Sequence, residues 1–234
     1  MTLRRILWVA AFLLVSQAAF AAEYRFVYVD AFQGDYDLRE SYLFDVNNVG
    51  AACGWATDLP TYSGFGWAPG TDKTKVPFTL ARGINDAGKI VGLDKLYDPA
   101  TGNLVTIPKV AVAPPVALDI NNNDVVVGYD ETCICSNSNF VLQIPFVWDP
   151  VNGARPVNVP NAKELVKVND SNVAVGIIRG GAHDGFVYDI ATGRSILLSA
   201  FLPPNQYPWN EAADINDLGV VVGKHRGVDF STYD

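Results

Sequence analysis

Three aspartates recur at one position of a repeated pattern, and a pair of carboxylates is sufficient for acid/base hydrolysis of a glycosidic bond. Asp45, Asp119 and Asp214 each lie two residues before an asparagine that starts a turn. If the repeats surround an axis, these aspartates form a ring. The same position holds Gly83 and Lys167 in the other copies, so it tolerates a cation. We therefore keep carboxylate hydrolysis as the alternative function and assign no catalytic residue.

Other catalytic and metal-binding patterns are missing from the sequence. It has no G-x-S-x-G, H-E-x-x-H, P-loop or C-x-x-C motif, and it contains 2 histidines. His183 lies in a glycine-rich segment and His225 lies between two basic residues, which is typical of solvated loops and rims. The repeated turns offer too few oxygen ligands for calcium. We expect no metal and no cofactor, and the missing motifs favour a non-enzymatic protein over an enzyme.

The 3 cysteines, Cys53, Cys133 and Cys135, allow at most one internal disulfide. Cys53 occupies a strand position that holds valine in the other copies of the repeat, so we expect it to be a buried apolar residue. For the other two, a strained bridge within Cys-x-Cys, free thiols and pairing with another chain all remain open.

The repeated pattern that carries these residues is Val or Ile, then Asn, six further residues and Gly. The fourth residue, counted from the Asn, is always Gly, Asn or Asp, the types that enter the left-handed region most easily. This pattern predicts a tight β-hairpin followed by an apolar strand that is covered on both faces. The five copies occupy residues 45–54, 83–92, 119–128, 167–176 and 214–223.

The spacing of the copies indicates how the hairpins are assembled. Their asparagines are 38, 36, 48 and 47 residues apart, and aromatic strands such as PFVWDPVNG (145–153) lie between them. A period near 40 residues without amphipathic helices is typical of propeller blades. Turn-rich all-β proteins also contain such hairpins by chance, but five copies with an unvarying Asn-to-Gly distance favour true repeats. We predict an all-β, five-bladed β-propeller-like ring whose last blade is closed by the N-terminal strand Phe26–Asp30.

The N-terminus predicts export. Residues 1–21 combine Arg4 and Arg5 with an apolar run and a small-x-small cleavage site, which is typical of a secretory signal peptide. Residues 22–234 then form a single repeat domain, secreted or periplasmic through the general secretory route, with no membrane insertion after the signal is removed. The net charge of −8 makes nucleic acid an unsuitable partner.

The pairing of IN-D-x-G-x-V-V-G with an aromatic F-x-W/Y strand behind a signal peptide resembles the bacterial extracellular repeat family called HAF. The resemblance covers roughly residues 42–226, and the third and fourth turns depart from it, with Asp124 and Asn172 in place of Gly. It implies an exported, propeller-like repeat protein, and it implies no particular activity.

A binding or interaction module is therefore the predicted function, with a glycan or a protein or peptide as the ligand. Residues just after each repeat emerge at the end of the sheets opposite the turns. Because they differ chemically, they predict one asymmetric site or none. The oligomeric state is left open. The candidate ligand-binding residues are Trp55, Asp58, Asp94, Tyr129, Asp130, Arg179, His225 and Arg226.

Overall fold

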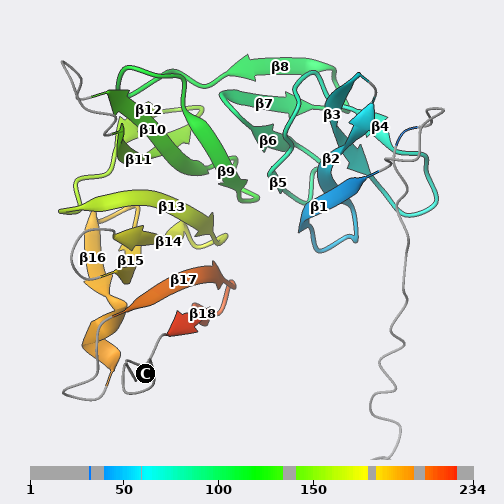
Figure 1. Ribbon diagram of the computed structural model, residues 1–234. Coiled ribbons are helices and arrows are strands. Elements are labelled where there is room, and N and C mark those ends of the chain that lie inside the picture. Colours follow the sequence, from blue (N-terminus) through cyan, green and yellow to red (C-terminus); the bar gives the residue numbers. More distant parts are fainter. Residues whose placement is uncertain are drawn as a thin grey trace, which may run out of the picture.

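The computed structural model describes residues 32, 40–58, 60–133, 141–178, 183–202 and 209–225. These residues form an all-β structure of five antiparallel sheets, each built from consecutive strands (Figure 1). Within these ranges, the structure has no helix with the length and hydrophobicity that crossing a bilayer requires. The predicted signal peptide lies outside them.

The strands are short and follow the chain order within each sheet. The first sheet contains β1 (Ser41–Val46), β2 (Ala52–Asp58), β3 (Thr61–Trp67) and β4 (Thr74–Lys75). The second contains β5 (Gly83–Ile84), β6 (Ile90–Gly92), β7 (Lys95–Asp98) and β8 (Asn103–Thr106). The third contains β9 (Val116–Ile120), β10 (Val126–Cys133), β11 (Val141–Asp149) and β12 (Gly153–Pro156). The fourth contains β13 (Ala162–Val168), β14 (Val173–Ile178), β15 (Asp184–Asp189) and β16 (Arg194–Leu197). The 3-10 helix η1 (Leu198–Phe201) precedes the fifth sheet, which contains β17 (Asn210–Ile215) and β18 (Val221–His225).

Each sheet begins with a hairpin whose turn is the repeated pattern. The predicted left-handed conformation is confirmed at the fourth turn position, where a backbone N–H also closes the turn on the carbonyl of the repeat asparagine. The φ angles there are 81° at Gly50, 78° at Gly88, 60° at Asp124, 59° at Asn172 and 77° at Gly219.

The glycine that ends each repeat lies against the backbone of the segment before the turn, and the sequence predicts such a close approach. A Cβ atom on Gly128 would come within 2.0 Å of the Val116 carbonyl oxygen, and one on Gly54 within 1.8 Å of the Tyr42 carbonyl oxygen. The register of the paired strands shifts at or next to these glycines, so the bulge needs a residue without a side chain there.

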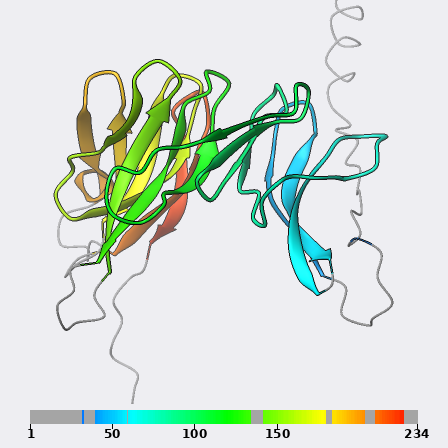
Figure 2. The same ribbon diagram turned by 90° about the horizontal axis from the view of Figure 1, so that it is seen from above.

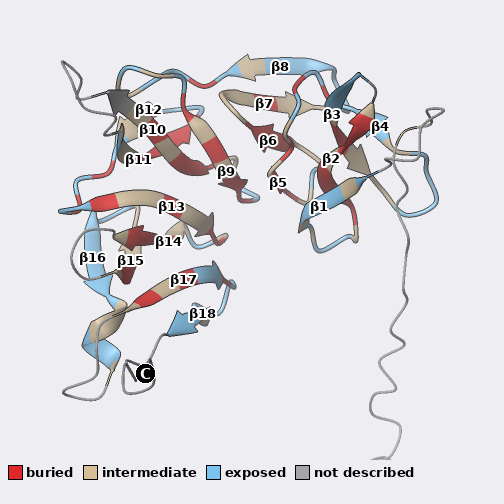
Figure 3. Ribbon diagram, viewed as in Figure 1, coloured by how far each residue is buried: buried red, intermediate tan, exposed pale blue. Residues whose placement is uncertain are grey.

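The core is divided into layers between successive sheets. Val126 packs toward the second sheet with Val91 and Phe146, whereas Val127 packs toward the fourth sheet with Leu165. Successive residues of a strand point to opposite faces, so both faces of β10 are buried (Figure 3). The apolar runs of β6, β10 and β14 are explained by burial between two neighbouring sheets.

The first strands of consecutive sheets contact one another, in the order β1, β5, β9, β13 and β17. Figure 1 shows the sheets following one another along a curve that stays open between the first and the last sheet. In Figure 2 the green, yellow and red strands of the third to fifth sheets lie close together, and the first sheet stands at the other end.

The fifth sheet differs from the others because its described part contains two strands where the others contain four. Val222 on β18 is 56% exposed, whereas the equivalent Val127 and Val175 are fully buried. The segment Phe26–Asp30, predicted to complete this sheet, lies outside the described residues. Phe32 is described and packs edge-to-face on Phe65 of the first sheet, with ring centroids 6.1 Å apart.

Candidate functional site

The repeat asparagines connect each turn to the next one along the chain. The side-chain oxygen of Asn121 accepts hydrogen bonds from Val125 N (2.9 Å) and Asn123 N (3.0 Å) within its own turn. Its side-chain nitrogen donates to the Asn169 carbonyl of the following turn at 2.8 Å. Equivalent bonds join Asn47 to Asn85, Asn85 to Asn121 and Asn169 to Asn216. The turns therefore form a continuous hydrogen-bonded ladder across the sheets.

The residue after each repeat asparagine forms a second row of polar contacts. Asn122 donates from its side chain to Asp86 and to Asp170, both at 2.8 Å. Asp86 also accepts from Asn48, and Asp170 N donates to Asp217 at 2.7 Å. These exposed side chains surround a cavity of about 240 Å³ that is lined by residues of all five turns.

A largely buried ion-pair network adjoins this row and joins three sheets. Lys167 Nζ on β13 lies 2.7 Å from Asp45 Oδ1 on β1 and 3.1 Å from Asp119 Oδ1 on β9. The other oxygen of each carboxylate accepts a backbone N–H from the next sheet, from Ile84 at 2.9 Å and from Val168 at 2.8 Å. Every charged group of the network therefore has a partner, as burial requires.

The electrostatics of the network follow from its burial. Burial raises the pKa of Asp119 to about 7, although Lys167 opposes the shift. Burial would lower the pKa of Lys167, but Asp119 and Asp45 more than offset this and raise it. Lys167 thus stays protonated at neutral pH and separates the two carboxylates.

The structure brings together two of the three aspartates that the sequence places in a ring. Asp214 lines the same cavity, but its carboxylate accepts the N–H of the adjacent Ile215 at 2.8 Å and is not part of the ion-pair network. Gly83 fits because a Cβ atom there would lie 2.8 Å from Asp119 Cα. The central role of Lys167 was missed by sequence reasoning, although a single cation among acids at equivalent positions was a usable signal.

Most of the charged candidates at the opposite end of the sheets have structural partners. Asp130 is fully buried, and its Oδ2 accepts the N–H groups of Val110 (2.7 Å) and Ala111 (2.8 Å). Asp58 binds Lys75 and Ser63. Asp130 therefore holds the loop at Val110 and Ala111, and Asp58 holds the hairpin of β2 and β3.

The remaining predicted residues are dispersed or lie outside the described part of the chain. Asp94 forms an ion pair with the adjacent Lys95 at 3.0 Å. Tyr129 lies on β10, half-buried, and His225 is exposed at the end of β18. Arg179 and Arg226 fall outside the described ranges. Asp58, Asp94 and Asp130 therefore each have separate partners, and the described candidates do not share a common contact.

Trp55 is the exception, because two tyrosines that the sequence analysis did not select lie against it. The Tyr42 ring stacks on Trp55 with centroids 4.6 Å apart and an interplanar angle of 21°. The Tyr62 ring meets Trp55 at 4.7 Å and 84°. The three residues come from β1, β2 and β3, and we call them the aromatic row. Both tyrosines are about half exposed, at 48% and 54%.

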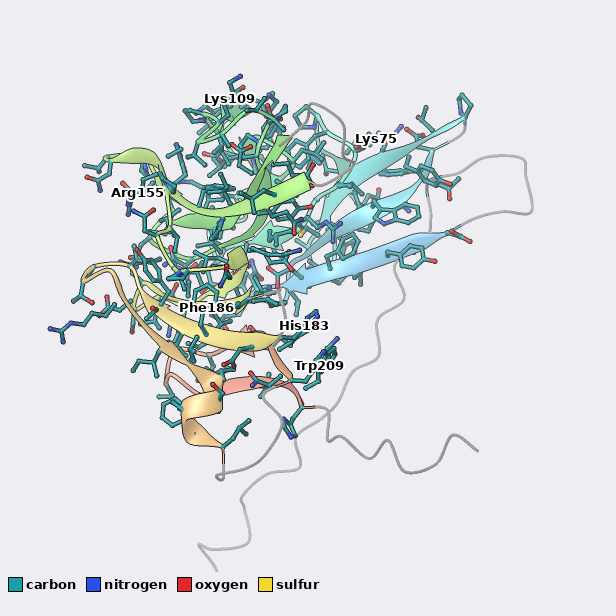
Figure 4. All side chains as sticks on the ribbon, turned by 60° about the vertical axis from the view of Figure 1, so that its left-hand side comes forward. Lys75, Lys109, Arg155, His183, Phe186 and Trp209 are labelled. Carbon is teal, nitrogen blue, oxygen red and sulfur yellow. The ribbon has the colours of Figure 1, made fainter. Side chains whose placement is uncertain are left out.

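His183 belongs to a second mixed cluster, between the fourth and fifth sheets. Its ring lies 5.4 Å from the Trp209 ring, and its Nδ1 lies 3.9 Å from Glu211 Oε1 (Figure 4). Glu211 also pairs with Lys224 at 2.7 Å, and the Lys224 ammonium lies over Trp209. No base and nucleophile arrangement involving His183 is present among the described side chains.

Cys53 is a free, buried thiol, as the sequence predicts. Burial, with a contribution from Asp45, raises its pKa well above the ordinary range, so it is a poor nucleophile. The side chains of Cys133 and Cys135 lie outside the described part. Among the side chains that are described, no group of three or more metal-ligating residues comes together.

No protein-family model matches the chain, and no curated protein is significantly similar to it.

Proposed function

We propose that the chain is the binding module of an exported, five-bladed propeller-like protein, with its ligand at the end of the sheets opposite the turns. The aromatic row carries this proposal. It places large amphipathic rings in solvent at that end, and such rings contribute strongly to binding at low conformational cost. The acidic net charge of −8 disfavours nucleic acid as the ligand.

Export and the HAF-like repeat character belong to the same proposal. They depend on the signal-like residues 1–21 and on the five repeats. The mass of the protein recovered from the periplasm or the medium tests export, because removal of residues 1–21 is expected. A protein retained in the cytoplasm at full mass would contradict it.

Closure of the fifth blade by Phe26–Asp30 completes the proposed ring. Within the described residues β18 pairs with β17 alone, and Val222 on β18 is exposed. Phe32, which follows the segment in the sequence, packs on the first sheet. Deletion of residues 22–31 is expected to lower the unfolding temperature. An unchanged unfolding temperature would argue against closure by this segment.

The binding proposal is tested by screening the full chain against immobilised glycans and a peptide library. The matched variant is Tyr42→Ala/Tyr62→Ala. Phe201→Ala serves as a control, because Phe201 is 70% exposed and lies in η1, away from the first sheet. We expect at least one ligand whose binding the double variant loses and the control keeps. If neither library yields such a ligand, the aromatic row is not a binding site and the proposal fails.

A carbohydrate hydrolase is the second candidate, and one observation favours it. Asp119, with its pKa raised to about 7, lies beside Asp45 at the base of the polar cavity. Against it, Lys167 occupies the space between the carboxylates, and both are bound to backbone N–H groups. Release of reducing ends from neutral polysaccharides, abolished by Asp119→Asn, would establish the hydrolase in place of a binding module.

A further inference from the structure

We infer that the aromatic row, together with Glu40, binds a neutral glycan, with one sugar ring on each tyrosine. This inference rests on the proposed binding function and assigns its ligand class. Trp55 lies between the two tyrosines and contacts both rings. It therefore acts as a buttress that holds both rings in place before a ligand arrives.

The strand register places a carboxylate on the same face as the rings. Hydrogen bonds join Glu40 to Thr57, with Thr57 N donating to Glu40 O at 2.8 Å and Glu40 N donating to Thr57 Oγ1 at 3.1 Å. Thr57 is in turn paired with Tyr62, and Tyr42 with Trp55. Cross-strand partners share a face of the sheet, so Glu40 lies on the face of the aromatic row. The side chain of Glu40 is exposed.

The opposite face of the same hairpin has a different chemistry. Asp58 and Ser63 alternate to that face, where Asp58 accepts hydrogen bonds from both Ser63 and Lys75. Gly64 pairs with Trp55 and adds no side chain to the face of the aromatic row. The face of the row therefore combines exposed rings, phenol hydroxyl groups and one carboxylate.

This combination suits a sugar better than a proline-rich peptide. Such peptides dock between separated aromatic rings, whereas these rings are in contact at 4.6 and 4.7 Å and leave no slot between them. Prolines also bring no backbone N–H for Glu40, so its carboxylate would lose water without gaining a donor. A sugar offers an apolar C–H face to the rings and hydroxyl donors to the carboxylate.

The spacing of the two tyrosines and the negative charge of the chain restrict the class of ligand further. Tyr42 and Tyr62 stand two strands apart, about 10 Å, which is a suitable length for about two adjacent sugar rings. Glu40 and the net charge of −8 disfavour acidic polysaccharides. The ligand is therefore a neutral oligosaccharide or the exposed end of a neutral polysaccharide.

Calorimetric titration of the full chain with neutral β-linked hexasaccharides of glucose, xylose, mannose and N-acetylglucosamine tests the inference. We expect Tyr42→Ala and Tyr62→Ala each to weaken binding about tenfold, the order of one aromatic stacking contact. Tyr42→Phe keeps the ring and most of the affinity, Glu40→Gln weakens binding, and Phe201→Ala leaves it unchanged. Thermal unfolding of each variant verifies that it is folded.

The outcomes separate this inference from the proposed function. A proline-rich decapeptide that binds the row when the hexasaccharides do not would overturn the glycan assignment and keep the binding module. Hexasaccharide binding that the tyrosine variants leave unchanged would overturn the assignment of the site. Binding of neither ligand class by the folded chain would overturn both.

Discussion

Removal of the Lys167 charge is the most informative perturbation, because one ammonium group serves two carboxylates on other sheets, one buried (Asp119) and one partly buried (Asp45). We predict that Lys167→Met lowers the unfolding free energy by about 3 kcal/mol at pH 8, at the lower end of the range for breaking a buried pair. The side chains of Lys167 and Asp119 are 21% and 6% exposed, so water compensates little for the lost partner.

The decrease in unfolding free energy caused by Lys167→Met should be larger at high pH than at low pH. Because burial raises the pKa of Asp119 to about 7, the folded chain binds that proton more tightly than the unfolded chain. The contribution of Asp119 to stability therefore falls as the pH rises from about 4 to about 7. Without Lys167 the pKa of Asp119 in the folded chain rises further. In the variant the stability contributed by Asp119 therefore continues to fall at higher pH. The deficit of the variant is then larger at pH 8 than at pH 5.

Urea unfolding followed by tryptophan fluorescence measures the deficit at both pH values. Lys75→Met is the matched control, since Lys75 is 52% exposed in its pair with Asp58 and should cost less than about 1 kcal/mol. Adding Asp45→Asn and Asp119→Asn to Lys167→Met should restore most of the stability, because no unpaired charge then remains. A deficit that equals the control, or that does not change with pH, would refute the reasoning.

Three further predictions concern the repeat itself. Asn121→Ala removes four hydrogen bonds and should lower the unfolding free energy, measured with urea, by about 2–4 kcal/mol. Asn216→Ala, at the exposed end of the ladder, should lower it clearly less. Equal losses in the two variants would contradict the ladder. Gly128→Ala should cost about 3 kcal/mol, because its Cβ atom would clash with a backbone carbonyl of β9. Gly88→Ala, with φ of 78° and open space around it, should cost about 1 kcal/mol, and the reverse order would be inconsistent with the bulge. In a variant whose other two cysteines are serine, Cys53 should react with a thiol reagent at pH 8 only after denaturant is added, and rapid native labelling would contradict its burial.

The candidate site was less predictable than the fold. Trp55 could be selected because it follows the closing glycine of the first repeat. Tyr42 and Tyr62 could not, since their relation to Trp55 depends on the register of three strands and on a bulge between Leu43 and Asp45. Asp130 was selected as a ligand-binding residue, yet it is buried under a loop whose course the sequence does not specify.

The sequence by itself determined the local conformations, because they depend on residue types within a few positions of one another. The left-handed fourth turn position, the close approach at the closing glycine and the apolar run of the second strand all follow from such short-range chemistry. The tertiary structure alone decided the pairing of Lys167 with Asp45, which lies 122 residues away, and the ladder from one turn to the next. Contacts of this kind depend on how the sheets are placed side by side, and no short stretch of sequence contains that information.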